Sequence, residues 1–104
     1  MKKRAVIYRR RARTDINSLY RYIARESSPE IAFGYIQRIE KTCFSLAHFP
    51  ERGSSIRGQT AGLRKMGFEH RVTILFKVGE EQVDILRILY GGRNLEPVLE
   101  RLYK

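Results

Sequence analysis

Arginine is the residue type in this sequence that is best placed to do chemistry. A guanidinium group presents a fork of N–H donors that suits two-point contact with a phosphate or a carboxylate. Adjacent strands of a sheet place side chains about 5 Å apart, so residues from neighbouring strands can converge on one patch. The residues predicted to bind a target in this way recur in and beside the apolar runs of the second half of the chain: Arg64, Arg71, Arg87, Tyr90 and Arg93.

The usual signatures of catalysis are missing from the sequence. His48 and His70 fall in different predicted elements, and neither has a carboxylate at a spacing that would orient it. The sequence holds no H-x-x-H, C-x-x-C or paired-aspartate motif that would supply metal ligands. Gly91-Gly92-Arg93 follows a predicted strand but lacks the length of a phosphate-binding loop. We therefore expect no catalytic residue, no metal and no cofactor.

Composition sets the scale and the class of the protein. The 104 residues allow one domain with one core, so the whole chain is expected to fold as a single unit. A net charge of +10 combined with 42% hydrophobic residues indicates a folded, basic surface and an acidic or polyanionic partner. Cys43 is the only cysteine and is expected to be buried. Neither a signal peptide nor a membrane span is expected, which favours the cytoplasm.

The first half of the sequence predicts a strand followed by two helices. Residues 4–9 form a short β-prone run flanked by charge, which is typical of an edge strand. An apolar stripe from Ala12 to Ile23 then predicts a helix that fades at residues 26–27. Ser28 can cap a second helix that starts at Pro29, and its apolar stripe continues until Pro50 stops it. Two helices with so short a link are expected to form an antiparallel hairpin.

The second half predicts a loop over residues 50–62, three strands and a final helix. The strands cover Leu63–Met66, residues 70–78 and Gln82–Tyr90, and the third has apolar residues on both faces, as in a central strand. In that strand, alternation places Val83, Ile85 and Leu89 on one side and Leu86, Ile88 and Tyr90 on the other. Asn94 can cap a short helix that carries Leu95, Val98, Leu99 and Leu102. The order β-α-α-β-β-β-α predicts an α+β fold, with an antiparallel-dominated sheet packed against an N-terminal helical hairpin.

These elements, taken together, resemble the RelE/ParE toxin family of type II toxin-antitoxin systems. The resemblance covers nearly the whole chain, and it is carried by the helix from Ala12 to Ile23, a second helix with Ala32 and Tyr35, the loop of residues 49–53, Leu63-Arg64, the strand of residues 68–76, and the ending Ile85-Leu86-Arg87-Ile88-Leu89-Tyr90-Gly91-Gly92-Arg93. The resemblance implies a fold of this class. It also implies one of two activities.

RelE-like members cut mRNA on the ribosome with several basic residues and a late tyrosine. Their basic positions fall here on Thr60 and Gly62, and the tyrosine falls near Leu99, so only Arg71 and Arg93 remain as catalytic candidates. Two arginines alone do not supply the proton transfers of phosphodiester cleavage. The chain is closer to ParE-like members, which implies inhibition of DNA gyrase by protein-protein binding. The nuclease, with Tyr90 or Tyr103 as its tyrosine, stays an alternative, as does a non-toxic basic binding module that shares the fold.

The resemblance also implies a partner, a cognate ParD-like antitoxin with an acidic segment, in a hetero-oligomeric complex. No direct contact with DNA is expected except through the antitoxin. A thin core suggests that part of the helical hairpin's apolar surface stays exposed, and the residues predicted to receive the antitoxin lie there: Leu19, Tyr20, Ile23, Tyr35, Ile36 and Ile39. If Leu19 and Ile36 are core residues instead, replacing either with alanine should destabilise the fold by about 2 to 4 kcal/mol.

Overall fold

The computed structural model describes residues 3–56 and 61–91 of the chain. Its elements, in chain order, are β1 (Ala5–Tyr8), α1 (Arg10–Glu26), α2 (Pro29–Ser45), β2 (Ser54–Ser55), β3 (Leu63–Phe68), β4 (Val72–Val78) and β5 (Gln82–Tyr90). The predicted final helix and its leucines lie outside the described residues. Two helices and a five-stranded sheet confirm the predicted α+β class.

The sheet is mixed, in the strand order β1-β5-β4-β3-β2. β1 pairs with β5 in parallel, and every other pair of neighbouring strands is antiparallel. The order confirms that the first strand lies at an edge and that β5 is a central strand. β1 covers only the first part of β5, because the register runs from Ala5 opposite Gln82 to Tyr8 opposite Ile85 and the chain then turns into α1.

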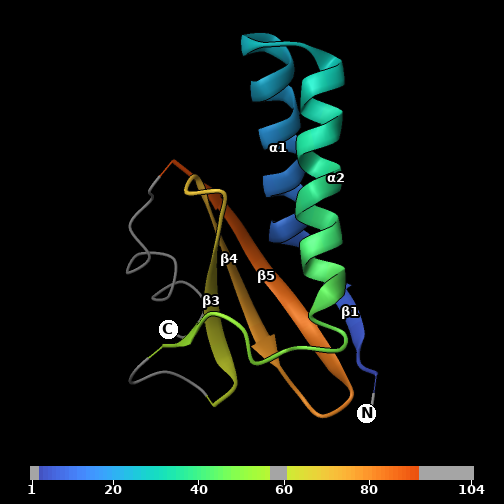
Figure 1. Ribbon diagram of the computed structural model, residues 1–104, viewed down its shortest axis with the longest axis vertical. Helices are drawn as coiled ribbons and strands as arrows, with labels where there is room; N and C mark the ends of the chain where they lie inside the picture. The colour runs from blue at the N-terminus through green and yellow to red at the C-terminus, as the bar shows by residue number, and fades with distance from the viewer. Residues whose placement is uncertain (1–2, 57–60, 92–104) are drawn as a thin grey trace.

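The two helices form the predicted hairpin and lie on one face of the sheet (Figure 1). α2 begins as its sequence indicates, since the Ser28 hydroxyl accepts a hydrogen bond from the Ile31 amide at 3.1 Å and Pro29 is the first helical residue. It ends at Ser45, before Pro50. Leu46 and Ala47 donate instead to Cys43 and Phe44 in a tighter turn, and both are buried there. No helix of the described residues is long and apolar enough to cross a membrane.

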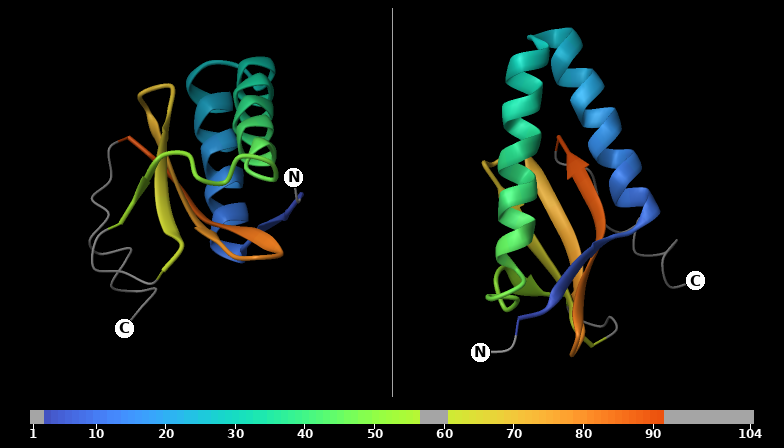
Figure 2. Two further views of the ribbon diagram at one scale, coloured as in Figure 1. Left: turned by 60° about the horizontal axis from the view of Figure 1, so that its bottom comes forward. Right: turned by 90° about the vertical axis from the view of Figure 1, so that its right-hand side faces the viewer.

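The hairpin and the sheet form two layers (Figure 2), and the side chains of the core fill the space between them. α1 contributes Ala12 and Leu19, and α2 contributes Ile36, Ile39 and Cys43. The sheet side consists of residues from three strands: Met66, Phe68, Val72, Ile74, Phe76, Val83, Ile85 and Ile88. Leu63, Leu75 and Leu89 are buried outside this cluster. Burying large apolar side chains is the main stabilising contribution in a chain of this size.

Three sequence expectations about the strands were wrong. A register shift in the β4–β5 pair lets Phe76 face Ile85 and Leu75 face Arg87, so Leu86 is an extra residue in β5. The bulge reverses the alternation after Ile85, and Ile88 therefore joins Val83 and Ile85 in the core while Leu89 lies opposite Thr73. β3 continues through Gly67 to Phe68. The predicted loop contains β2, which pairs with Arg64 and Lys65 of β3.

Candidate functional site

The ends of β3, β4 and β5 bring two of the predicted target-binding residues together. Val72 pairs with Phe68 on one side and with Tyr90 on the other, so these three positions lie side by side across the sheet. Arg71 precedes Val72 directly. Its amide donates to the Phe68 carbonyl at 3.1 Å, and its carbonyl accepts from the Gly91 amide at 2.9 Å. Arg71 and Tyr90 are thus held by backbone hydrogen bonds at one end of the sheet.

Aromatic side chains from both helices support this end of the sheet. The ring of Tyr22 on α1 lies 5.6 Å from that of Tyr90, and the ring of Tyr35 on α2 packs edge-on to Phe68 at the same centroid distance. Offset and edge-to-face contacts of this kind are the favourable geometries for aromatic pairs. We call the group formed by Tyr22, Tyr35, Arg38, Phe68, Glu69, Arg71 and Tyr90 the sheet-end cluster.

Arg38 and Glu69 join α2 to the turn between β3 and β4. The Arg38 Nε and Nη2 atoms donate to the two oxygens of Glu69 at 2.8 and 3.0 Å, a two-point ion pair. The same guanidinium lies 5.2 Å from the centroid of the Tyr35 ring, in cation-π geometry. The hydrogen bonds from Arg38 lower the pKa of Glu69 below its ordinary value, and those to Glu69 raise the pKa of Arg38.

Tyr35 is the least satisfied polar residue of the cluster. Its hydroxyl is buried, with no hydrogen-bond partner among the described residues. Burial, followed by the negative charge of Glu69, raises the pKa of this phenol. Tyr35 therefore stays neutral, and its ring acts as packing surface for Arg38 and Phe68.

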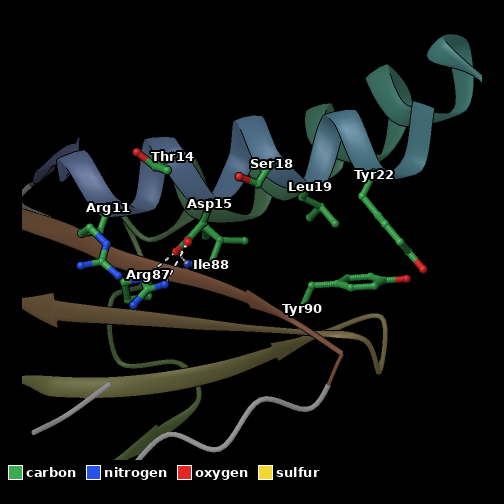
Figure 3. Close-up of a pocket in the computed structure, with 9 residues that line it drawn as sticks. All are labelled: Arg11, Thr14, Asp15, Ser18, Leu19, Tyr22, Arg87, Ile88 and Tyr90. Atoms are coloured by element: carbon green, nitrogen blue, oxygen red, sulfur yellow. Dashed lines mark hydrogen bonds and ion pairs between the residues drawn. The ribbon is translucent and has the colours of Figure 1, made fainter. Parts of the chain in front are cut away.

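A cavity of about 510 Å³ lies between α1 and the part of β5 that β1 does not cover (Figure 3). Its inner wall contains a second arginine-carboxylate pair, in which Arg87 Nε and Nη2 donate to Asp15 at 2.7 and 3.0 Å. The Ile88 amide also donates to Asp15, at 2.9 Å. Asp15 thus accepts from a backbone N–H of β5 beyond the end of β1, where β4 is the only strand paired with β5 in the described sheet.

The structure separates the remaining predicted target-binding residues from the sheet-end cluster. Arg87 is 6% exposed and committed to Asp15, so in this conformation it offers no surface to a target. Arg64 organises the loop before β3, because it donates to the carbonyls of Glu51, Arg52 and Gly53 and to the Ser55 hydroxyl. Arg93 lies outside the described residues. Among the described residues of the predicted set, Arg71 and Tyr90 lie together at the end of the sheet, and Tyr90 also lines the cavity whose wall contains Arg87.

The predicted antitoxin-binding residues mostly face the core. Leu19, Ile36 and Ile39 are buried, and Tyr20, Ile23 and Tyr35 are partly buried against the same core cluster. The first three do not form the exposed face that the apolar stripes suggested, because the sheet covers those stripes. The apolar residues that do stay exposed are others: Ile7, Tyr22, Ile31, Phe33, Phe44 and Phe49.

Cys43 is buried, as expected. Burial raises the pKa of its thiol to about 11, so the thiol is protonated at neutral pH and is not a nucleophile. Within residues 3–56 and 61–91, no group of three histidine, cysteine, aspartate or glutamate residues is arranged to hold a metal ion.

Three residues that matter here were not singled out from the sequence. Asp15, Arg38 and Glu69 each act through a partner far away in the chain, so local spacing gives no signal for them. One indirect signal existed, since an arginine between apolar residues, such as Arg87, requires an acidic partner. Asp15 is the only acid in the first 25 residues.

Comparisons with known proteins agree with this architecture. A family model described as the ParE toxin of the type II toxin-antitoxin system parDE matches residues 6–95. Toxin ParE3 of Caulobacter vibrioides is 30% identical over 90 residues, which cover 86% of this chain and 89% of the relative.

Two solved structures have the same fold. The chromosomal ParDE toxin-antitoxin system of P. aeruginosa contains a chain that matches with a TM-score of 0.74 and 22% identity, covering 88% of this chain and 99% of its own. A chain of the RelBE2 toxin-antitoxin complex of Mycobacterium tuberculosis matches with a TM-score of 0.63 and 22% identity, covering 85% and 98%.

Proposed function

This chain belongs to the ParE toxin family of type II toxin-antitoxin systems. From that premise we propose that it inhibits DNA gyrase by protein-protein binding. We also propose that a cognate ParD-like antitoxin neutralises it. Because DNA gyrase acts on DNA in the cytoplasm, the proposed site of action is the cytoplasm. The toxin acts as a ligand of its target rather than as an enzyme, and the surface that carries the interaction is the sheet-end cluster.

The observation that best supports binding over catalysis is the way the arginines are used. Arg64 is engaged by loop carbonyls and Arg87 by Asp15, which leaves Arg71 as the exposed member of the predicted set in the described chain. Of the two positions that carry basic residues in RelE-like nucleases, Gly62 has no side chain and residue 60 lies outside the described chain. One arginine can anchor a carboxylate, but phosphodiester cleavage also needs groups that transfer protons.

The surface of the helical hairpin supports an antitoxin partner. Tyr22, Ile31, Phe33 and Phe44 are large apolar side chains that stay exposed on the two helices. The part of the hairpin near the α1–α2 link extends beyond the sheet (Figure 1). A partner helix with an apolar face would cover such side chains, and acidic residues on it would offset part of the +10 charge. The exposed residues thus replace the buried stripe as the proposed antitoxin contacts.

A supercoiling assay tests the gyrase proposal. Purified gyrase and relaxed plasmid are incubated with increasing amounts of the chain, with and without the cognate antitoxin, and mRNA cleavage is followed in parallel in a translation extract. We expect inhibited supercoiling or trapped linear DNA, reversed by the antitoxin, and intact mRNA. Normal supercoiling together with cut mRNA would establish the nuclease instead. If the chain neither inhibits supercoiling nor cuts mRNA, and does not inhibit growth in cells, it is a non-toxic binding module.

The response to Arg71→Ala separates the first two outcomes further. A binding interface spreads its energy over several residues, so the loss of gyrase inhibition should be graded, on the order of tenfold. A nuclease that depends on Arg71 would lose activity by several orders of magnitude. Arg64→Ala is a poor control because Arg64 holds the loop before β3. Arg21→Ala removes an exposed charge from α1 and is the better control, since it should leave gyrase inhibition unchanged.

A further inference from the structure

The turn between β3 and β4 has an unusual backbone. Phe68 ends β3, Val72 begins β4, and the two residues at the centre of the turn, Glu69 and His70, have φ angles of 48° and 60°. They are the only residues other than glycine with positive φ in the described part of the chain. The hydrogen bond from the Arg71 amide to the Phe68 carbonyl closes a β-turn around these two residues, and a β-turn with positive φ at both central positions is normally built from Asn-Gly, because other side chains are strained there.

Contacts from α2, from β3 and from the end of β5 hold this turn in place. Arg38 of α2 binds both oxygens of Glu69, and its guanidinium also lies over Tyr35, which in turn packs on Phe68. The Arg71 amide closes the turn onto Phe68, and the Gly91 amide at the end of β5 donates to the Arg71 carbonyl. Strain of this kind persists only where the surroundings fix the conformation, and it concentrates at functional sites.

Glu69 and His70, the two strained residues, are exposed, so burial of their side chains does not account for their positive φ angles. Glu69, His70 and Arg71 are all exposed on the surface. Within residues 3–56 and 61–91, no hydrogen bond or ion pair engages the Arg71 guanidinium. By contrast, the β4–β5 turn at the opposite end of the sheet begins with Gly79, whose amide donates to Gln82, and has no such strain.

We propose that the β3–β4 turn is the part of the toxin that contacts its target protein, with His70 and Arg71 receiving acidic side chains and with Arg38 and Glu69 as positioning residues. This inference rests on the proposed function and names the contact surface within it. The guanidinium fork of Arg71 matches the two oxygens of a carboxylate. The turn also carries Glu69, and a carboxylate beside the contact disfavours a nucleic-acid backbone, which is uniformly negative. The target surface is therefore an acidic patch of a protein.

A substitution that keeps the turn but removes its side chains tests the proposal. The double variant Glu69→Asn with His70→Gly supplies the residues that this backbone prefers, so the hairpin should form and the melting temperature should not fall. Growth arrest on induction and inhibition of supercoiling should both weaken, by about tenfold or more in the concentration needed. Glu80→Asn, which removes a charge from the other exposed turn, is the matched control and should behave like the wild type.

The outcomes separate this proposal from the gyrase proposal. A double variant that folds and arrests growth as strongly as the wild type would overturn the role of the turn, whatever the target is. Growth arrest without inhibition of supercoiling would overturn gyrase as the target, and the sensitivity of that arrest to the double variant would still decide the role of the turn. If the wild type binds labelled single-stranded RNA and the variant does not, the assignment to an acidic protein surface is overturned.

Arg38 can be tested as a positioning residue separately. Arg38→Ala should weaken growth arrest while the melting temperature changes little, because the ion pair is exposed. Combining Arg38→Glu with Glu69→Arg reverses the pair and should restore part of the activity that either single change removes. A double reversal no better than the single changes would overturn the positioning role.

Discussion

The molecule contains two arginine-carboxylate pairs that have almost the same geometry and opposite surroundings. Arg87 binds Asp15 at 2.7 and 3.0 Å, and Arg38 binds Glu69 at 2.8 and 3.0 Å. Each joins a helix to the sheet. The side chains of the first pair are 7% and 10% exposed, whereas those of the second are 54% and 42% exposed.

This difference in burial gives the two pairs different roles. Removing one partner of a buried pair leaves an uncompensated charge in a medium of low polarity, which is strongly destabilising. An exposed pair is screened by water and contributes little to stability. The Asp15–Arg87 pair is therefore a structural connection between α1 and β5. The Arg38–Glu69 pair, which is attached to a strained and exposed turn, matters for where it holds the residues beside it.

Breaking the buried pair should give the largest effect. Asp15→Ala leaves the Arg87 guanidinium and the Ile88 amide without their acceptor, and we expect a loss of about 3 to 5 kcal/mol in the free energy of unfolding. Urea denaturation measures this loss. Arg21→Ala, an exposed change on the same helix away from the cavity, is the control and should cost well under 1 kcal/mol, roughly the range of surface substitutions. A small effect of Asp15→Ala would contradict the structural role.

A cavity in the hydrophobic core should give the next largest loss of stability. Ile36 of α2 is 8% exposed and belongs to the main cluster, so Ile36→Ala should cost about 2 to 4 kcal/mol through lost contacts and a cavity. Thermal melting with and without the cognate antitoxin separates this role from a binding role. Unchanged stability of the free chain combined with weaker antitoxin affinity would show that Ile36 belongs to the interface.

Replacing the buried pair by apolar residues sharpens the comparison. Asp15→Leu combined with Arg87→Met removes both charges and keeps the volume filled, so the only unmet group is the Ile88 amide. We expect a loss of about 1 to 3 kcal/mol, smaller than for Asp15→Ala alone. Denaturation of both variants under the same conditions provides the test. A double variant less stable than Asp15→Ala would mean that the pair contributes more than charge compensation.

Neutralising the exposed pair should give the smallest change in stability, with a defined dependence on pH. The pKa of Glu69 is lowered in the folded chain, so its ion pair stabilises the fold above the ordinary value of 4.5 and loses that effect as the pH falls below it. Glu69→Gln should therefore melt slightly below the wild type at pH 7, and the two curves should merge under acidic conditions. A difference in melting temperature that does not shrink as the pH falls below 4.5 would have to come from something other than this carboxylate.

The sequence predicts most of the described elements, because most of them have a local signal. Ser28 and Pro29 mark the start of α2, and alternating apolar residues mark β4. The alternation prediction fails in β5 after Ile85, since a bulge at Leu86 has no sequence signature of its own. β2 was missed because its two serines carry no apolar pattern and are held only by pairing with β3.

The candidate site was only partly predictable. Arg71 and Tyr90 were identified by residue type, and the strand pairing that brings them together follows from the predicted topology. The partners that decide how the arginines are used come from remote segments: Asp15 for Arg87 and the loop carbonyls for Arg64. The strain at Glu69 and His70 depends on the register of the hairpin and on Arg38, neither of which local spacing reveals.

Direct binding of the purified chain to purified gyrase, followed by biolayer interferometry with immobilised toxin, tests the central claim most directly. We predict saturable binding that is weakened on the order of tenfold by the double variant Glu69→Asn with His70→Gly and is abolished when the cognate antitoxin is added first. No binding to gyrase by a toxin that still arrests growth would contradict the account of the target. Equal binding by the wild type and the double variant would contradict the account of the turn.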